Sequence, residues 1–132
     1  MPVVRQLSVF LANKPGVLAR LCKTFAKHNI NIMAISVSDT VDHAVVRMVT
    51  SDPAKARSLL EDCGILVVDT DVLALSIPDK PGQLATLAQK LSTAKINIEY
   101  SYGTTGRAGD GSGIFIMRVS DIPKAKKVLK LK

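Results

Sequence analysis

The spacing of apolar residues along the first half of the chain predicts a small unit that combines strands and helices. Apolar and polar residues alternate over residues 3–12, as in a half-buried strand. From Val17 to Lys27 the apolar residues recur every three or four positions, as on the buried face of a helix. Two stretches rich in β-branched residues, 30–38 and 43–50, are separated by a turn and indicate a pair of antiparallel strands.

A second helix and a closing strand complete this unit. Ser51 or Asp52 can cap the helix, Pro53 suits its first turn, and Gly64 suits its end. Residues 65–68 then form a strand. The order β-α-β-β-α-β is the ferredoxin-like arrangement, in which both helices cover one face of a four-stranded antiparallel sheet. The predicted fold class is therefore α+β.

The same pattern returns in the second half of the chain. Residues 13–18 (Asn-Lys-Pro-Gly-Val-Leu) come back 66 positions later as residues 79–84 (Asp-Lys-Pro-Gly-Gln-Leu). Asn31-Ile32 returns at the same offset as Asn97-Ile98. A repeat of this length is a small domain, so we predict two domains, residues 1–69 and 70–132, side by side in one larger sheet. The last strand of the second domain is largely missing, and a strand from another element or chain could fill its place.

Length and composition place the protein among soluble, cytoplasmic proteins. A domain of about 65 residues buries only about 60% of its unfolded surface, so the two copies should pack on each other, on a second chain, or both, and we expect a homodimer. The sequence has no apolar run of the ~20 residues that a membrane helix needs, and no signal peptide is evident. The two cysteines, Cys22 and Cys63, are expected to be free thiols.

The positive charge does not by itself predict nucleic-acid binding. The net charge is +7, of which residues 70–132 carry +5, from 10 basic and 5 acidic residues. RNA-recognition modules share the β-α-β-β-α-β order, but they need exposed aromatic side chains on their middle strands. Residues 44–49 contain none, and Phe115 stands alone in the second copy. We therefore expect no nucleic-acid partner.

The chain offers little for catalysis. His28 and His43 have no evident Ser, Cys or carboxylate partner, and no zinc-ligand spacing is present. The glycine-rich residues 103–113 lack the Gly-Lys-Ser/Thr of a phosphate-binding loop and are expected to form a hairpin loop. We expect no enzymatic activity, no metal and no cofactor.

The repeated turn is the best candidate for a binding site. It should lie at the end of the first strand and open the first helix, so that free N–H groups at residues 16–18 and 82–84 suit a carboxylate. Asn13 and Asp79 offer oxygen acceptors for an ammonium group, and Asn31 and Asn97 are expected at the same level. This combination fits an α-amino acid. Alternatively, Asn13 and Asp79 only cap helices.

These residues also carry a family resemblance. The run of strand, Asn/Asp-x-Pro-Gly-x-Leu, helix and Asn-Ile resembles the ACT domain, and it occurs twice, over residues 3–68 and 72–131. ACT domains typically bind amino acids at a domain–domain interface and regulate metabolic enzymes. The resemblance implies ligand contacts at two sets of positions: Asn13, Gly16, Val17, Leu18 and Asn31, and Asp79, Gly82, Gln83, Leu84 and Asn97.

The resemblance implies a stand-alone pair of ACT domains that binds an amino acid between units and changes its own assembly or a separate metabolic enzyme. Serine is not favoured, because some serine-binding members carry a histidine where this chain has Leu11 and Ile77. The second turn is the better candidate, since Asp79 is charged and Tyr100 and Tyr102 follow Asn97 closely. The alternative is a protein–protein interaction module that binds no ligand and docks on a separate enzyme subunit.

Overall fold

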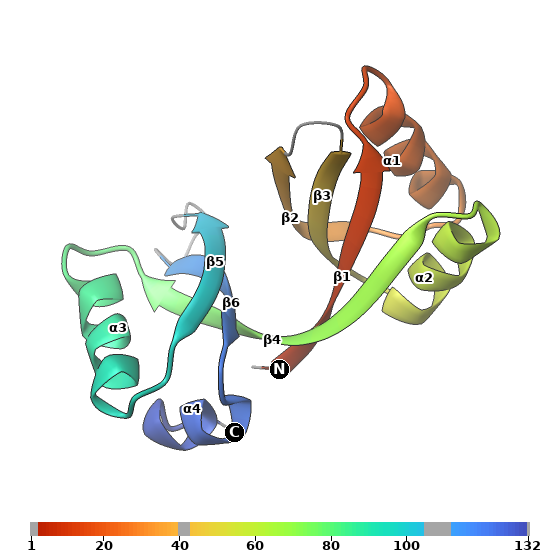
Figure 1. Cartoon of the computed structure of the whole chain (residues 1–132). Coiled ribbons are helices and arrows are strands. Elements are labelled where there is room, and N and C mark those ends of the chain that lie inside the picture. The colour runs from red at the N-terminus through yellow and green to blue at the C-terminus, as the bar shows by residue number, and fades with distance from the viewer. Residues whose placement is uncertain (1–2, 40–42, 105–111, 132) are drawn as a thin grey trace. The chain divides into compact units, whose positions relative to one another are not determined.

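The structure is a computed structural model, and it describes residues 3–39, 43–104 and 112–131 (Figure 1). Most of the loop expected at residues 103–113 therefore lies outside the described residues. The elements follow the predicted order of strands and helices, and the α+β class with two ferredoxin-like units is confirmed. They are β1 (Val3–Ala12), α1 (Val17–Lys27), β2 (Ile32–Asp39), β3 (His43–Thr50), α2 (Pro53–Asp62), β4 (Leu66–Pro78), α3 (Gln83–Thr93), β5 (Ile98–Thr104), β6 (Ser112–Val119) and α4 (Ile122–Val128).

The chain divides into two compact units, and β1 and β4 each contribute residues to both. The first unit is Arg5–Thr70, and the second contains Val3 and Val4 together with the described residues from Asp71 onward. The hydrogen-bonded strand order is β2-β3-β1-β4-β6-β5. In the first unit, this order places β1 between β3 and β4, as in a ferredoxin-like sheet.

The second unit receives its fourth strand from the start of β1. Val3 and Val4 belong to this unit, and β1 is the neighbour of β4. Val3 also packs against the hydrophobic core of the second unit. The start of β1 thus takes the position beside β4 for which the sequence predicts a strand from another element or chain.

One predicted break in the chain is absent. The repeat predicts that the strand at residues 65–68 ends the first copy and that a new strand begins the second, but the structure has one strand, β4, of 13 residues. The intervening residues, Asp69 to Asp71, include neither glycine nor proline, so nothing in the backbone chemistry ends the strand between the two copies.

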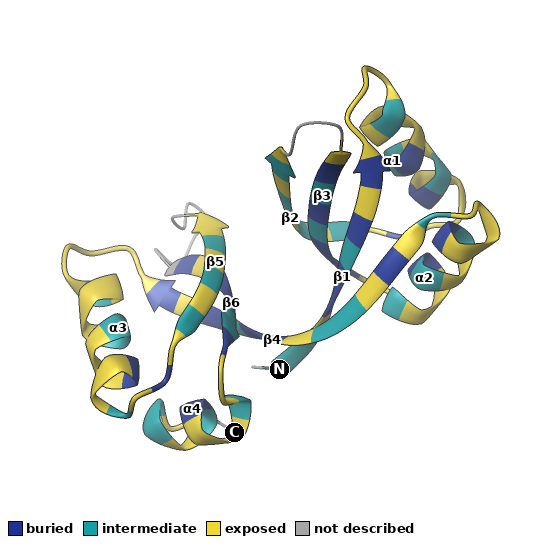
Figure 2. Ribbon diagram, in the orientation of Figure 1, coloured by how far each residue is buried: buried dark blue, intermediate teal, exposed yellow. Residues whose placement is uncertain are grey.

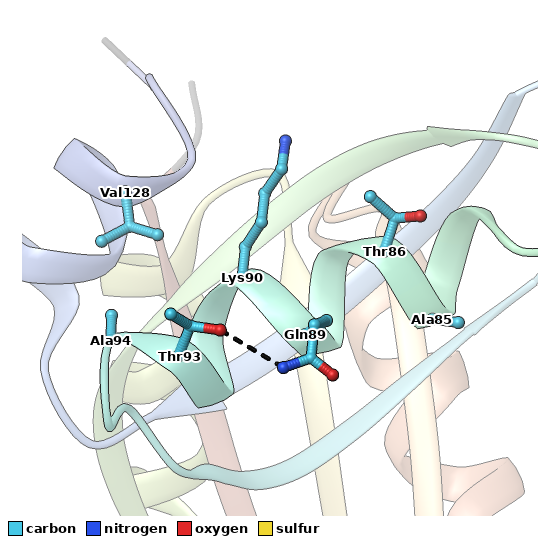
Figure 3. Close-up of a pocket in the computed structure, with 7 residues that line it drawn as sticks. All are labelled: Ala85, Thr86, Gln89, Lys90, Thr93, Ala94 and Val128. Carbon is cyan, nitrogen blue, oxygen red and sulfur yellow. Dashed lines mark hydrogen bonds between the residues drawn. The ribbon is translucent and has the colours of Figure 1, made fainter.

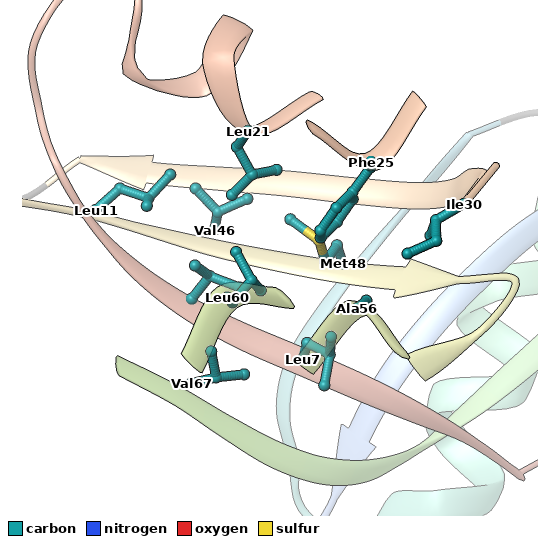
Figure 4. Close-up of a cluster of buried hydrophobic side chains, with 11 residues drawn as sticks. Leu7, Leu11, Leu21, Phe25, Ile30, Val46, Met48, Ala56, Leu60 and Val67 are labelled. Atoms are coloured by element: carbon teal, nitrogen blue, oxygen red, sulfur yellow. The ribbon is translucent and has the colours of Figure 1, made fainter. Parts of the chain in front are cut away.

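The core of the first unit lies between its sheet and its two helices (Figures 2 and 4). Opposite residues of β1 and β3, such as Leu7 and Met48, point to the same face of the sheet and are 1% and 0% exposed. Phe25 of α1 packs over them at 1% exposure. The buried members of this cluster are Leu7, Val9, Leu11, Leu21, Phe25, Ile30, Val46, Met48, Ala56, Leu60 and Val67.

The second unit has a core of its own, built in the same way. Leu73 of β4 lies opposite Met117 of β6, and both are buried under Leu91 of α3. The buried members are Leu73, Leu75, Ile77, Leu91, Ile96, Met117, Val119 and Ala125. Because each unit has its own contiguous core, each turn is held by a separate packed scaffold.

Each helix in the described part of the chain ends with the same backbone motif. The residue after each C-cap has a positive φ: Asn29 at 59°, Gly64 at 73°, Lys95 at 61° and Lys130 at 56°. The next N–H then reaches back to a carbonyl five residues earlier, as from Ile96 to Leu91 at 2.9 Å. This is the Schellman motif, which satisfies the last carbonyl groups of a helix. The predicted end at Gly64 is confirmed.

Candidate ligand-binding site

The two repeated turns have nearly identical backbones. Gly16 and Gly82 are the residues that precede α1 and α3, with φ 86° and ψ −13° and −8°. This left-handed conformation favours glycine, and a Cβ added at either position would meet nothing within 4 Å. The glycines are therefore needed for the path of the backbone and not to avoid a neighbour. Neither helix has a side-chain cap, so the alternative that Asn13 and Asp79 serve as caps is wrong.

The start of each helix presents backbone N–H groups without a partner. The first backbone bonds back to the glycines come from Arg20 to Gly16 and from Thr86 to Gly82, both at 3.0 Å. The N–H groups of Leu18 and Leu84, two residues before these donors, bond to no atom of the described residues. Because the positive end of the helix dipole adds to them, both positions suit an anion such as a carboxylate.

The polar residue of the turn has a different environment in each unit. In the first unit, Nδ2 of Asn13 donates to Oδ1 of Asp39, the last residue of β2, at 2.5 Å. This bond fixes the amide and leaves its oxygen as an acceptor. In the second unit, the carboxylate of Asp79 is exposed and has no partner among the described residues. Asp79 therefore remains available for an ammonium group, whereas the Asn13 amide is already engaged.

The second turn borders a small hollow. Asp79, Gln83 and Leu84 line it, and its volume is about 210 Å³. The other lining residues are Ile77, Pro78, Lys80, Gly113 and Phe115. Val17 of the first turn lines another hollow, of about 310 Å³, but Asn13 and Leu18 do not line it. Three of the five positions predicted for the second site thus share one cavity, and Gly82 lies in the same turn.

Asn31 and Asn97 do not lie beside the turns. In the first unit, Ala12 at the end of β1 pairs with His43, whereas Ile32 pairs with Thr50 at the other end of β3. Seven strand residues separate these levels, or about 24 Å at ~3.4 Å per residue. The expectation that Asn31 returns to the level of the turn is wrong, because α1 carries the chain to the opposite end of the sheet.

The second unit repeats this arrangement. Pro78 pairs with Ser112, and Ile98 pairs with Val119 at the far end of β6. Asn97 lines a different hollow from Asp79, one of about 410 Å³. Each asparagine instead bonds to a serine of its own unit. The N–H of Asn31 donates to Oγ of Ser51 at 2.9 Å, and that of Asn97 donates to Oγ of Ser120 at 3.0 Å.

The tyrosines of β5 also lie away from the second turn. Tyr100 and Tyr102 pair with Arg118 and Ile116, and they alternate with Ser101, which pairs with the core residue Met117. They therefore point to the face of the sheet that the helices do not cover. Neither lines the hollow beside Asp79.

A larger hollow in the second unit contains none of the predicted site residues. It has a volume of about 730 Å³ and lies along α3 and α4 (Figure 3). Its lining residues are Ala85, Thr86, Gln89, Lys90, Thr93, Ala94 and Val128. Gln89 donates to Thr93 at 3.2 Å, so part of the polar lining is already satisfied.

Comparison with known proteins shows the family to which the chain belongs. Residues 2–132 match the family described as an ACT domain pair, and the chain belongs to that family. Among solved structures, it is similar to a protein from Bacteroides thetaiotaomicron, with 38% identity and a TM-score of 0.90 over 97% of this chain and 87% of the other. No curated protein matches the chain.

Two regulatory subunits of aspartate kinase share the fold. The subunit from Thermus thermophilus, in its ligand-free form, is 14% identical with a TM-score of 0.69, over 98% of this chain and 96% of the other. The subunit from Thermus flavus is 16% identical with a TM-score of 0.64, over 98% of this chain and 92% of the other.

Among the described residues, no helix is long and apolar enough to cross a membrane.

Proposed function

We propose that this ACT domain pair is a non-catalytic regulatory protein that binds an amino acid at an interface between ACT units. The second turn carries the proposal: Leu84, whose N–H has no partner among the described residues, and Asp79, whose side chain is exposed, both line the same small hollow. The N–H groups suit the ligand's carboxylate, and Asp79 suits its ammonium group. Family membership and the fold shared with regulatory subunits of aspartate kinase support a regulatory role.

We further propose that a second ACT unit completes each site. Asn31 and Asn97 lie about 24 Å along the sheet from the turn of their own unit, which is too far for one amino acid to span. They can serve as ligand residues only if another unit brings its asparagine beside the turn. A homodimer would provide such a unit, and the first turn, with Asn13, Gly16, Val17 and Leu18, would then pair in the same way.

The partner that responds to the ligand is proposed to be a separate metabolic enzyme in the cytoplasm. The likeness to aspartate kinase subunits makes a kinase of amino-acid metabolism one candidate. Cys22 and Cys63 are free thiols, which suits a reducing compartment. Nothing in this proposal requires a metal, a cofactor, a nucleic acid or a membrane.

A second function, a protein–protein interaction module without a ligand, is favoured by one observation. The edge strand β2 exposes three apolar side chains: Met33 at 61%, Ile35 at 42% and Val37 at 53%. Edge strands with exposed apolar residues readily pair with another chain. In this second reading, the strand docks on an enzyme subunit whether or not an amino acid is present.

Thermal unfolding in the presence of each of the twenty amino acids separates the two functions. A ligand at about 100 times its Kd should stabilise the protein by about 2.7 kcal/mol. We expect stabilisation by one or two amino acids, lost in Asp79→Ala and weakened in Asn97→Ala. Asn13→Ala is the matched variant in the first unit and should retain the response of the second turn. A folded protein that no amino acid stabilises would favour the docking module.

A further inference from the structure

The hollow beside the second turn has an aromatic wall that the other unit lacks. Phe115 of β6 lines the hollow and also packs against the core of the second unit. Its neighbour on β5 is Gly103, which lies directly opposite it in the sheet. A Cβ built on Gly103 would lie 2.6 Å from Cδ1 of Phe115 and 2.9 Å from Cγ. The phenyl ring therefore occupies the space that any other side chain at residue 103 would need.

The backbone also restricts residue 103 to glycine. The same Cβ would lie 2.5 Å from the carbonyl oxygen of Ile114, an atom held in the pairing of β5 with β6. A larger residue at position 103 would thus have to displace both the ring and the strand. The ring of Phe115 thus fills the space above Gly103. It packs against the core on one side and against β5 on the other.

The first unit carries a different pair at the equivalent positions. Val37 lies opposite Val46 there, and Val46 is buried at 1% exposure. A pair of valines in the first unit thus corresponds to a glycine and a phenylalanine in the second. Because the strands pair in the same way in both units, only the second unit gains a phenyl ring at this position, beside its turn.

We propose that Phe115, seated on Gly103, determines which amino-acid side chain the second turn accepts. This inference rests on the proposed function, because it assigns the selectivity of the same site. Leu84 and Phe115 supply apolar walls, while Asp79 remains for the ammonium group. At about 210 Å³, the hollow is smaller than the ~300–1,000 Å³ typical of pockets for larger ligands. The class of ligand is therefore an α-amino acid with a small aliphatic side chain.

The physical basis of this selectivity is a fixed wall. The ring packs against the core on one side and over Gly103 on the other, and we expect it to exclude side chains longer than the distance from the turn to its face. A shorter aliphatic chain fills the cavity and contacts the ring, and each methylene that fits or fails to fit a pocket changes affinity by roughly 10- to 200-fold. Removing the ring should therefore move the preference toward larger side chains and not simply weaken all ligands.

The test measures the affinities of glycine, alanine, valine, leucine, methionine and phenylalanine by calorimetry for the full chain and three variants. In Phe115→Ala, we expect at least a tenfold loss for the best small ligand and a gain for leucine, methionine or phenylalanine. In Gly103→Ala, which leaves the phenylalanine in place but crowds it, we expect the best ligand to weaken at least tenfold. Ile114→Ala is the matched control, because this 54% exposed side chain lies on the other face of β6. It should change no affinity.

Each outcome is decisive. If Phe115→Ala keeps the ranking of the wild type while Asp79→Ala abolishes binding, the assignment of selectivity to Phe115 is wrong and the proposed function stands. If the wild type binds none of the six, this inference is overturned, whereas the proposed amino-acid site falls only if none of the twenty amino acids stabilises the protein. Circular dichroism of each variant ensures that a loss of affinity is read only from a folded protein. Should Phe115→Ala unfold, Phe115→Leu gives the same comparison with a smaller loss of core contacts.

Discussion

Replacing Lys95 with glycine should stabilise the protein, although glycine usually weakens helical segments. Lys95 follows the C-cap of α3 with φ 61°, in the left-handed region. An L-residue with a side chain pays roughly 1–2 kcal/mol for this conformation. Glycine removes that cost. It also destabilises the folded state by roughly 0.5–1 kcal/mol, because it loses more backbone entropy on folding. The expected net gain is about 1 kcal/mol, because the Schellman hydrogen bonds from residues 95 and 96 use only backbone atoms.

The control is the same substitution a few residues earlier in the same helix. Lys90 is an exposed residue inside α3, so Lys90→Gly removes the same charge and the same side chain. There glycine should cost about 1 kcal/mol, since the backbone is already right-handed. The two variants should therefore move the free energy of unfolding in opposite directions.

Urea unfolding followed by circular dichroism measures both changes. For a domain of this size, 1 kcal/mol corresponds to about 4 °C in Tm, so a thermal scan provides an independent reading. The reasoning fails if Lys95→Gly destabilises the protein as much as Lys90→Gly does. The reverse exchange at the end of α2, Gly64→Lys, should cost about 1–2 kcal/mol, because residue 64 has a φ of 73°. A neutral Gly64→Lys variant would also contradict the reasoning.

Three further predictions concern single side chains. Asp52→Ala should cost about 1 kcal/mol in urea unfolding, because Oδ1 accepts the N–H of Lys55 at 3.1 Å and caps α2; Asp52→Asn should restore most of it. Ser120→Ala should cost about 1 kcal/mol by removing the acceptor of the Asn97 N–H, and a neutral result would show that water replaces the hydroxyl. Asp69→Ala, which removes the partner of Arg5 and Arg57, should cost less than about 1 kcal/mol and almost nothing in 1 M salt; an effect independent of salt would contradict a surface ion-pair network.

The repeat made much of the fold predictable from sequence. Local signals such as Pro53 after Asp52, or the apolar spacing of α1, place helices without knowledge of the tertiary structure. The same signals could not place the start of β1, because Val3 and Val4 read as the beginning of a strand in the first copy. Which unit they join depends on their pairing with β4 and on the core of the second unit, and those residues lie more than sixty positions away in the sequence.

The candidate site was less predictable than the fold. The turn itself could be identified, because Gly16 and Gly82 need a conformation that few residues adopt. The position of Asn31 along the sheet could not be predicted, because it depends on the direction in which α1 runs over the sheet. In the sequence, Phe115 is only an isolated aromatic residue. Its role at the hollow follows from its register opposite Gly103, and an insertion in the intervening loop hides that correspondence from a fixed-offset alignment.

The start of β1 has a consequence for how the chain folds. The second unit includes Val3 and Val4, so its completion depends on an encounter between sequence positions about seventy residues apart. Such a long loop adds an entropic cost that helix and hairpin formation in the same unit do not share, and contacts of high sequence separation slow folding. The first unit closes its sheet over a similar separation, because β1 is also the neighbour of β4 there and Arg5 bonds to Asp69, 64 positions away. A single strand, β1, thus carries the long-range closure of both units, and we expect its pairing with β4 to form late in the folding of each.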